Sequence, residues 1–117
     1  PLTQPLDEVI SELEENLGCV ALDGERIVGC VRARIDGDLL LVGRIAIAPD
    51  QQGSGLGTDL LTAVETRGRE AGARVAELFT GSLSEANLRL YEREGYRESE
   101  RVPEDGGVEQ VFLRKEL

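Results

Sequence analysis

The first hydrophobic pattern along the chain is helical. Within Leu6–Leu17 the apolar positions recur at intervals of three and four residues, which places them along one side of an α-helix. Thr3 or Asp7 could cap such a helix, and Gly18 follows the last apolar position, where helices commonly end. The pattern therefore predicts an amphipathic helix over residues 6–17.

Two alternating runs follow, on either side of Asp23-Gly24, a dipeptide typical of tight hairpin turns. The alternation predicts an antiparallel pair of strands with apolar residues on one face and arginines on the other. The apolar set is Val20, Leu22, Ile27, Val31, Ala33 and Ile35, and the arginine set is Arg26, Arg32 and Arg34. The same spacing places Cys19 and Cys30 together on the arginine-bearing face, where a disulfide is geometrically conceivable.

The next run, Leu39–Ala48, is apolar on both faces apart from Arg44. It comes after a second turn, Asp36-Gly37-Asp38, which continues the antiparallel meander. A strand that is apolar on both faces is typical of the centre of a sheet that is covered on both sides.

Glycines and helix signals divide the rest of the chain into alternating elements. We expect a glycine-rich loop at Pro49–Gly57, a helix from Leu56 to about Ala71, a strand over Arg74–Thr80, a helix from Ser84 to about Glu94, and a final hairpin of Tyr96–Val102 with Val108–Leu113. In the first of these helices Leu60, Leu61 and Val64 should face the core, and Arg67, Arg69 and Glu70 should face outward.

This order predicts one mixed α/β domain over residues 1–117. Its sheet should be mostly antiparallel, with helices on both faces. The strand–loop–helix–strand succession from Leu39 to Phe79 favours one parallel pair, formed by a right-handed crossover.

Composition excludes several classes of function. The chain has 13 basic and 23 acidic residues, so its net charge of −10 disfavours binding to nucleic acid. Without histidine it cannot use Ser-His-Asp or Cys-His catalysis or a His-ligated zinc, and we expect no metal site. No signal peptide and no apolar run of membrane-spanning length is visible. The sequence therefore favours a cytoplasmic protein in which Cys19 and Cys30 stay reduced and take no part in catalysis.

The glycine-rich loop is the strongest candidate for chemistry. Gln52–Thr58 lies between a buried strand and the start of a helix, so its amides can form a pyrophosphate cradle at the positive end of the helix dipole. A Walker loop would need a lysine, which is absent, and a dinucleotide-binding fingerprint would need glycine at Thr58. From the loop alone, a tight turn whose glycines serve packing remains an equal alternative.

The residues around the loop resemble the GNAT superfamily of N-acetyltransferases. Gln52, Gly55 and Gly57 match its acyl-CoA-binding pattern Gln/Arg-x-x-Gly-x-Gly/Ala. The segment Leu90-Tyr91-Glu92-Arg93-Glu94-Gly95-Tyr96 is similar to the family's helix that ends in Leu-Tyr-x-x-x-Gly-Phe/Tyr. The resemblance covers about residues 19–113.

This resemblance implies a site for acetyl-CoA and no metal. Pantetheine would lie beside the strand residues Ile45, Ala46 and Ile47, and the pyrophosphate would lie on the loop. The loop residues are Gln52, Gly53, Ser54, Gly55, Leu56, Gly57 and Thr58. Ser84 or Asn87 would add a polar contact to the cofactor, although Ser84 could equally be a plain helix cap. Tyr91 corresponds to the general acid that protonates the departing thiolate, and packing of its helix on the sheet is the alternative role.

No general base can be assigned from the sequence. The positions at which relatives carry a glutamate are the apolar Leu41 and Phe79. Glu77 is a candidate on the same strand and face as Phe79, but an ion-paired or solvated carboxylate is the preferred interpretation, and transfer through water to a distant carboxylate is equally open.

Family members begin with a further strand and helix, which this sequence lacks. Because it contains no methionine and opens at Pro1, we expect that residues precede it in the full product, or that a partner subunit supplies the missing strand.

The resemblance thus implies acetyl transfer from acetyl-CoA to a primary amine, by direct attack in a ternary complex. A small molecule or a peptide could supply that amine, and a homodimer is compatible with the sequence. A non-catalytic acyl-CoA-binding module is the main alternative, and an interaction domain without a ligand is a weaker one.

Overall fold

The computed structural model describes residues 8–12 and 17–117. Its strands are β1 (Glu8–Glu12), β2 (Cys19–Asp23), β3 (Arg26–Val31), β4 (Ala33–Asp36), β5 (Leu39–Val42), β6 (Ala46–Ile47), β7 (Val75–Gly81), β8 (Arg97–Pro103) and β9 (Glu109–Glu116). Its helices are α1 (Leu56–Glu70) and α2 (Glu85–Arg93), with short 3-10 turns at Pro49–Gln51 and Asp105–Gly107.

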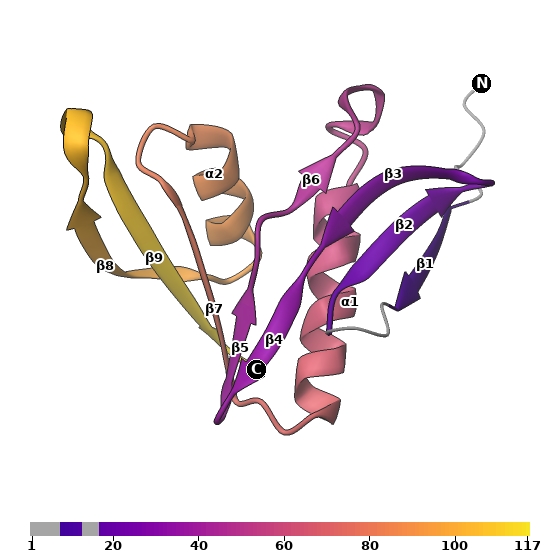
Figure 1. Ribbon diagram of the computed structural model, residues 1–117, viewed down its shortest axis with the longest axis horizontal. Coiled ribbons are helices and arrows are strands. Elements are labelled where there is room, and N and C mark those ends of the chain that lie inside the picture. The colour runs from indigo at the N-terminus through magenta and orange to yellow at the C-terminus, as the bar shows by residue number, and fades with distance from the viewer. Residues whose placement is uncertain (1–7, 13–16) are drawn as a thin grey trace.

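The strands form two sheets that share continuous runs of chain (Figure 1). The orders are β1-β2-β3-β6 and β4-β5-β7-β9-β8. The run over Leu39–Ala48, expected as one strand, is divided into β5 and β6. A second break, at Arg32, divides β3 from β4 beside the first one. The Gly43 amide donates a 2.6 Å hydrogen bond to the Arg32 carbonyl and ties the two breaks together.

The break opens a fork between β5–β6 and β7. β5 pairs with β7 in parallel as far as Leu41 and Glu77, as the predicted crossover requires, and is antiparallel to β4. Beyond that pair the chain leaves β7, and β6 pairs with β3 instead. Figure 1 shows the resulting V, with α2 beside the upper part of its opening.

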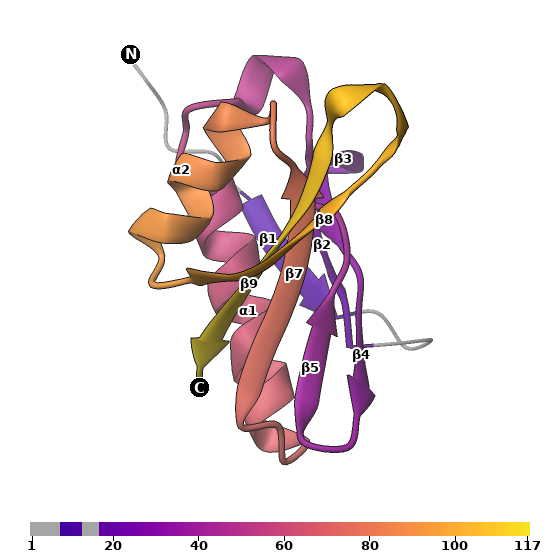
Figure 2. The ribbon, with the colours of Figure 1, turned by 90° about the vertical axis from the view of Figure 1, so that its left-hand side faces the viewer.

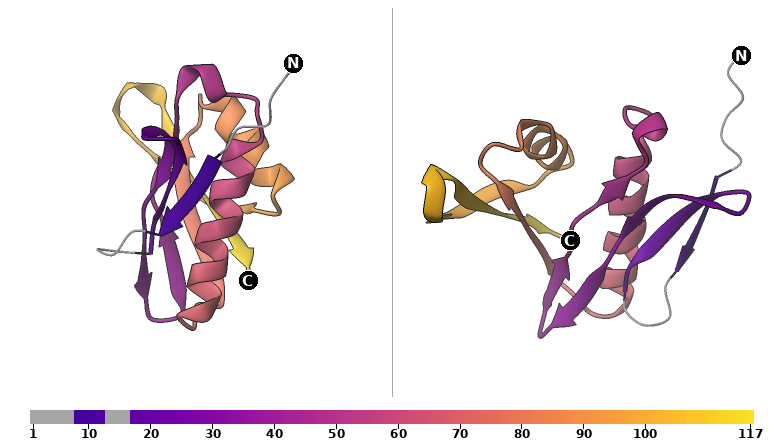
Figure 3. Two further views of the ribbon diagram at one scale, coloured as in Figure 1. Left: turned by 90° about the vertical axis from the view of Figure 1, so that its right-hand side faces the viewer. Right: turned by 45° about the horizontal axis from the view of Figure 1, so that its top comes forward.

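The core lies under the two helices, which pack on the same face of the sheets (Figures 2 and 3). α1 contacts β2 and β3 of one sheet and β5 of the other, so it spans the junction between the sheets. At Gly68 an added Cβ would lie 2.7 Å from Leu40 Cδ2, so any larger residue there would require the buried Leu40 side chain to shift. The mixed α/β fold is as predicted, but among the described residues no helix covers the second face.

The first element corrects the sequence analysis. Residues 8–12 form a strand antiparallel to β2, with Ile10 opposite Ala21, in place of the predicted helix. The remaining residues of the predicted helix, apart from Leu17, and its caps Thr3 and Asp7 lie outside the described residues. The β-branched Val9 and Ile10 suit a strand, and pairing with the exposed edge of β2 outweighs a helical spacing of apolar residues.

The faces of the first hairpin and the strand after it agree with the prediction only in part, since Val31 and Ala33 are buried as predicted. Cys19, Ala21 and Val28 are buried, whereas Ile27 is 61% exposed. A register shift between Ala21 and Leu22 leaves Val28 as an extra residue on β3, which is a β-bulge and places Ile27 and Val31 on opposite faces.

The bulge-bearing hairpin also separates the cysteines. Cys19 lies opposite Val31 and Cys30 lies opposite Val20, so the two thiols point to opposite faces of the sheet. The predicted shared face is therefore wrong, and a disulfide between Cys19 and Cys30 is excluded by geometry.

The later elements follow the sequence closely. Gly24 and Gly37 take positive φ in the two predicted turns, and Gly72 and Gly95 do so after α1 and α2. One predicted outward residue differs: Arg67 is only half exposed, because its Nη1 donates a 2.6 Å hydrogen bond to the Gly18 carbonyl.

Candidate active site

The glycine-rich loop gives α1 an open amino end. Gly55 is the N-cap residue with φ 88°, and Gly53 has φ 83°, conformations that favour glycine. No side chain caps the helix, so the first amides of α1 are available to an external acceptor. These amides carry the positive end of the helix dipole, which suits an anion such as a pyrophosphate.

An ion pair fastens this loop to the first hairpin. Arg26 on β3 donates two hydrogen bonds to Asp50, at 2.8 and 2.7 Å. Hydrogen bonding from Arg26 lowers the pKa of the Asp50 carboxyl to about 2. The pair fixes the start of the loop at a point several residues before Gly55.

A cavity of about 360 Å³ lies between the loop and α2. We call it the loop cavity. The predicted cofactor residues that line it are Ile45, Ile47, Gln52, Gly53, Gly55, Leu56, Gly57, Thr58 and Asn87. The structure therefore brings together most of the positions that the sequence singled out, from three separate elements.

Four predicted residues do not line this cavity. Ala46 is exposed on β6, and the Ser54 hydroxyl is used within the loop, where it donates a 2.6 Å hydrogen bond to the Gln51 carbonyl. Ser84 occupies the N-cap position of α2, but its side chain makes no cap hydrogen bond. Tyr91 is buried beneath the helix.

The Thr58 hydroxyl, expected to face a phosphate, donates a 3.1 Å hydrogen bond to Glu94 Oε2 and so ties α1 to α2. The sequence analysis did not identify Arg93, which also lines the loop cavity. Its Nε lies 3.8 Å from Glu94 Oε2. The helical spacing of Ala86, Leu90 and Arg93 would have placed these residues on one face with Asn87.

β6 presents an open edge to the fork. The Ala48 amide donates a 2.9 Å hydrogen bond to the Val28 carbonyl of β3. Because successive amides of a strand point to opposite edges, the Ile47 amide points away from β3 and into the fork. This edge can pair with an extended ligand.

Tyr91 lies on α2 with 3% of its surface exposed, and its ring packs edge-on against Tyr96 at a centroid distance of 6.1 Å. Burial raises the pKa of the Tyr91 phenol, and the positive charge of Arg44 opposes that rise. Arg44 belongs to the segment between β5 and β6, which borders the fork.

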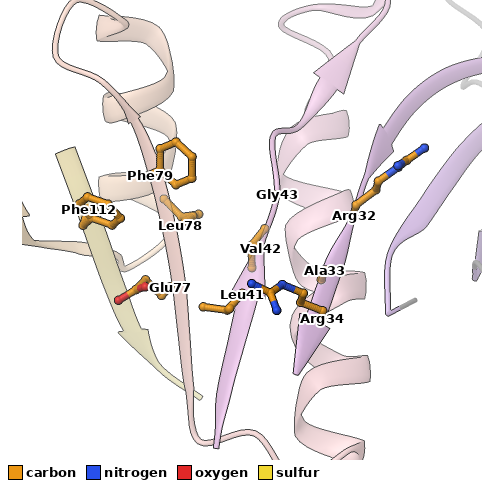
Figure 4. A pocket seen from close by; sticks show the side chains of 10 residues that line it. All are labelled: Arg32, Ala33, Arg34, Leu41, Val42, Gly43, Glu77, Leu78, Phe79 and Phe112. Carbon is orange, nitrogen blue, oxygen red and sulfur yellow. The ribbon is translucent and has the colours of Figure 1, made fainter. Parts of the chain in front are cut away.

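A second cavity, of about 460 Å³, opens on the other face of the fork (Figure 4). We call it the open-face cavity. Its lining residues come from the start of β4, the end of β5, β7 and β9; they are Arg32, Ala33, Arg34, Leu41, Val42, Gly43, Glu77, Leu78, Phe79 and Phe112. Gly43 of this lining is two residues from Ile45 of the loop cavity, so one short stretch of backbone separates the two.

Leu41 and Phe79 occupy the two positions at which relatives carry a glutamate, and both line the open-face cavity. Glu77 is the one carboxylate in that lining, and it accepts a 2.7 Å hydrogen bond from Arg114 Nε across the β7–β9 pair. The ion-paired interpretation of Glu77 is therefore confirmed.

The described residues contain neither a candidate metal site nor a membrane-spanning helix. Within residues 8–12 and 17–117, no group of three or more His, Cys, Asp or Glu side chains could hold a metal ion. No helix in this part of the chain has the length and apolar character needed to cross a membrane.

Comparison with solved structures gives the same fold. The chain is 26% identical to the IAA acetyltransferase of Bacillus cereus, with a TM-score of 0.75 over 86% of this chain and 77% of that one. It is 24% identical to a GNAT family acetyltransferase of Elizabethkingia anophelis with acetyl-CoA bound, with a TM-score of 0.74 over 86% and 75%. A Desulfovibrio desulfuricans protein assigned to the GNAT family is 24% identical, with a TM-score of 0.79 over 85% and 68%. No curated protein matches the chain.

The forked sheet and the glycine loop before α1 thus define an acetyltransferase of the GNAT type. The model of the Acetyltransferase (GNAT) family matches residues 2–96, and the chain belongs to this family.

Proposed function

We propose that the chain transfers an acetyl group from acetyl-CoA to a primary amine, by direct attack of the amine in a ternary complex. The observation that carries the proposal is the position of the two cavities. The loop cavity and the open-face cavity meet the fork from opposite faces, separated by residues 43–45. A donor and an acceptor can therefore approach the same point without competing for space.

The lining of the loop cavity fits acetyl-CoA. The uncapped amides after Gly55 and the Arg93 guanidinium would hold the pyrophosphate. The open edge at Ile47 would hydrogen-bond the pantetheine amides, beside Ile45 and Ala46, and Asn87 would add a polar contact from α2. When bound, acetyl-CoA supplies the thioester whose acetyl group passes to the amine.

The chain's own residues would orient the reaction and supply a proton. The open-face cavity holds the acceptor beside the fork. As the carbon–nitrogen bond forms and the carbon–sulfur bond breaks, Tyr91 gives its hydroxyl proton to the sulfur. The amine nitrogen loses its extra proton to water, and the tyrosinate regains a proton from water. Since burial raises the pKa of Tyr91, the phenol keeps that proton at neutral pH.

The test is release of CoA thiol from acetyl-CoA in the presence of a panel of primary amines. Turnover that depends on the amine supports the proposal. The alternative is a non-catalytic acyl-CoA-binding module, which is favoured by the engagement of Glu77 with Arg114 and the lack of any other carboxylate in the open-face lining. Tight binding of acetyl-CoA without thiol release with any amine would select that alternative.

A further inference from the structure

The open-face cavity has one cationic wall and one aromatic wall. We propose that the acceptor is a small amine that also carries a carboxylate and an apolar group, as an α-amino acid with an aromatic or branched side chain does. Arg34 binds the carboxylate, and Phe79 and Phe112 receive the apolar group. The inference rests on the proposed function, because it names the class of acceptor for the same reaction.

The register of the sheet places these groups in two parallel rows. Arg34 lies opposite Leu41, Leu41 lies beside Glu77, and Glu77 lies opposite Arg114, so a charged row crosses four strands. In the neighbouring row Gly43 is hydrogen-bonded to Arg32 on one side of the fork, and Phe79 lies opposite Phe112 on the other. The fork therefore opens between a cationic side and an aromatic side.

The cationic wall lacks an internal counterion. Neither Arg32 nor Arg34 makes an ion pair within 4.0 Å among the described residues, whereas Arg26, Arg101 and Arg114 each pair with a carboxylate. Glu77, the one carboxylate in the cavity, is held by Arg114 on the far side. In a chain of net charge −10, the Arg34 guanidinium, which faces the cavity without an ion-pair partner, indicates an anionic ligand.

Figure 4 shows the Arg34 side chain extending over β5 toward Leu41, within the cavity, whereas the Arg32 side chain points away from the fork. Arg34 is therefore the main contact to the carboxylate. These positive charges also disfavour the ammonium form of the acceptor, so they help to supply the neutral amine that attacks in a site without an assigned base.

The aromatic wall is accessible. Phe79 is 53% exposed, and its ring lies 5.5 Å from that of Phe112, centroid to centroid. The exposed Phe79 ring and the half-buried Phe112 ring gain stability when an apolar group covers them. The volume of about 460 Å³ is within the range of small-molecule sites and suits an amino acid better than a long peptide.

The test compares matched acceptors in acetyl-CoA-dependent thiol release: phenylalanine with phenethylamine, and leucine with 3-methylbutylamine. We expect kcat/KM to favour the carboxylate-bearing member by roughly tenfold or more, the scale of one charge-assisted hydrogen bond. In Arg34→Gln this ratio should approach one. Arg89→Gln, which removes an exposed arginine of α2 outside both cavities, is the matched control and should keep the ratio.

Equal or faster turnover of the amines without a carboxylate would overturn the inference, as would an unchanged ratio in Arg34→Gln. Peptides with an acidic residue near a free amino terminus form a second arm. If these peptides are acetylated and free amino acids are not, the small-molecule class is wrong.

A binding measurement separates this inference from the proposed function. N-acetylphenylalanine and N-acetylphenethylamine are titrated into the protein by calorimetry. Tighter binding of the first, lost in Arg34→Gln, supports the carboxylate site even if no amine is acetylated, in which case only the proposed function fails. Equal affinity of the two overturns the inference whatever the turnover.

Discussion

The Tyr96 hydroxyl donates a 2.8 Å hydrogen bond to Glu65 Oε2, and both side chains are almost completely buried. The other carboxylate oxygen of Glu65 accepts a 2.9 Å hydrogen bond from Lys115 Nζ, which also lies 5.6 Å from the centre of the Tyr96 ring. Glu65 belongs to α1, Tyr96 follows α2, and Lys115 belongs to β9. They connect the helix that follows the glycine loop to the segment that carries Tyr91.

Replacing Tyr96 with phenylalanine should destabilise the fold. Tyr96→Phe removes one of the two donors to a buried carboxylate, which costs about 1–3 kcal/mol in the free energy of unfolding. Urea denaturation followed by circular dichroism measures the change. Ser99→Ala removes an exposed hydrogen bond to the Phe112 carbonyl and should cost much less. A Tyr96→Phe protein as stable as the wild type would contradict this account of the buried carboxylate.

The same phenol gives an alkaline pH dependence. Burial, followed by the charge of Glu65 and its hydrogen bond, raises the pKa of Tyr96 in the folded state above its ordinary value. The stability that the neutral phenol contributes is therefore complete below the unfolded pKa of about 10, and is lost as the pH rises above it. Unfolding midpoints measured from pH 8 to 11 should fall, and the fall should be smaller in Tyr96→Phe. Equal slopes in the two proteins would contradict the assignment.

Gly55 should be needed for binding of acetyl-CoA. Nothing lies within 4 Å of a Cβ added there, so the effect of Gly55→Val comes from its positive φ, which moves the amides at the start of α1. Gly37 is a matched control, because it has φ 64° and open space around its Cβ but lies in a distant turn. Both valine variants should lose about 1–3 kcal/mol of stability. Only Gly55→Val should bind acetyl-CoA at least roughly tenfold more weakly, as measured by calorimetry.

Tyr91 should affect the rate of acetyl transfer and leave binding nearly unchanged. Tyr91→Phe keeps the packing against Tyr96 and removes the hydroxyl, so turnover should fall by roughly 10²-fold, the scale of one general acid. The loss should be smaller for an acetyl thioester whose thiol is more acidic, since that thiolate needs less help in leaving. Tyr96→Phe is the control for loss of a buried hydroxyl from the same ring pair outside both cavities, and it should keep its turnover once its lower stability is allowed for. Wild-type turnover in Tyr91→Phe would restrict Tyr91 to a structural role.

The cysteines should differ in reactivity and be dispensable for catalysis. Cys19 is fully buried, while Cys30 is half-buried on the opposite face of the hairpin. A thiol reagent should modify Cys30 in the folded protein and reach Cys19 only on unfolding. Cys30→Ala should keep its acetyltransferase activity. An acetyl group trapped on either thiol, or loss of activity in Cys30→Ala, would contradict a direct transfer.

The sequence predicted the elements whose signals are local. Glycines with positive φ mark the turns at Gly24 and Gly37 and the ends of both helices, and the spacing of Leu60, Leu61 and Val64 defines the buried side of α1. The loop residues were identified because strand, glycines and helix follow one another directly in the chain.

Features that depend on pairing between distant residues were missed. The helical spacing over residues 6–17 says nothing about the edge of β2, to which residues 8–12 add a strand. The bulge at Val28 moves Ile27 to the face opposite Val31 without any change in the alternation of residue types. The fork was not predicted because the run over Leu39–Ala48 is apolar apart from Arg44 and shows no break in its pattern. The run is divided only because β5 pairs with β7 and β6 pairs with β3. Arg93 reaches the loop cavity because α2 lies against α1, as the contact between Thr58 and Glu94 indicates.

The strand exchange at the fork also determines how the molecule comes apart. The runs over residues 26–36 and 39–47 each enter both sheets, and α1 lies on both. Neither sheet is therefore a module that could melt, be cleaved off or be transplanted alone, and the chain should lose its structure in a single cooperative step. A ligand held in the fork touches the line along which the sheets are joined, so its binding energy protects both halves of the molecule at once.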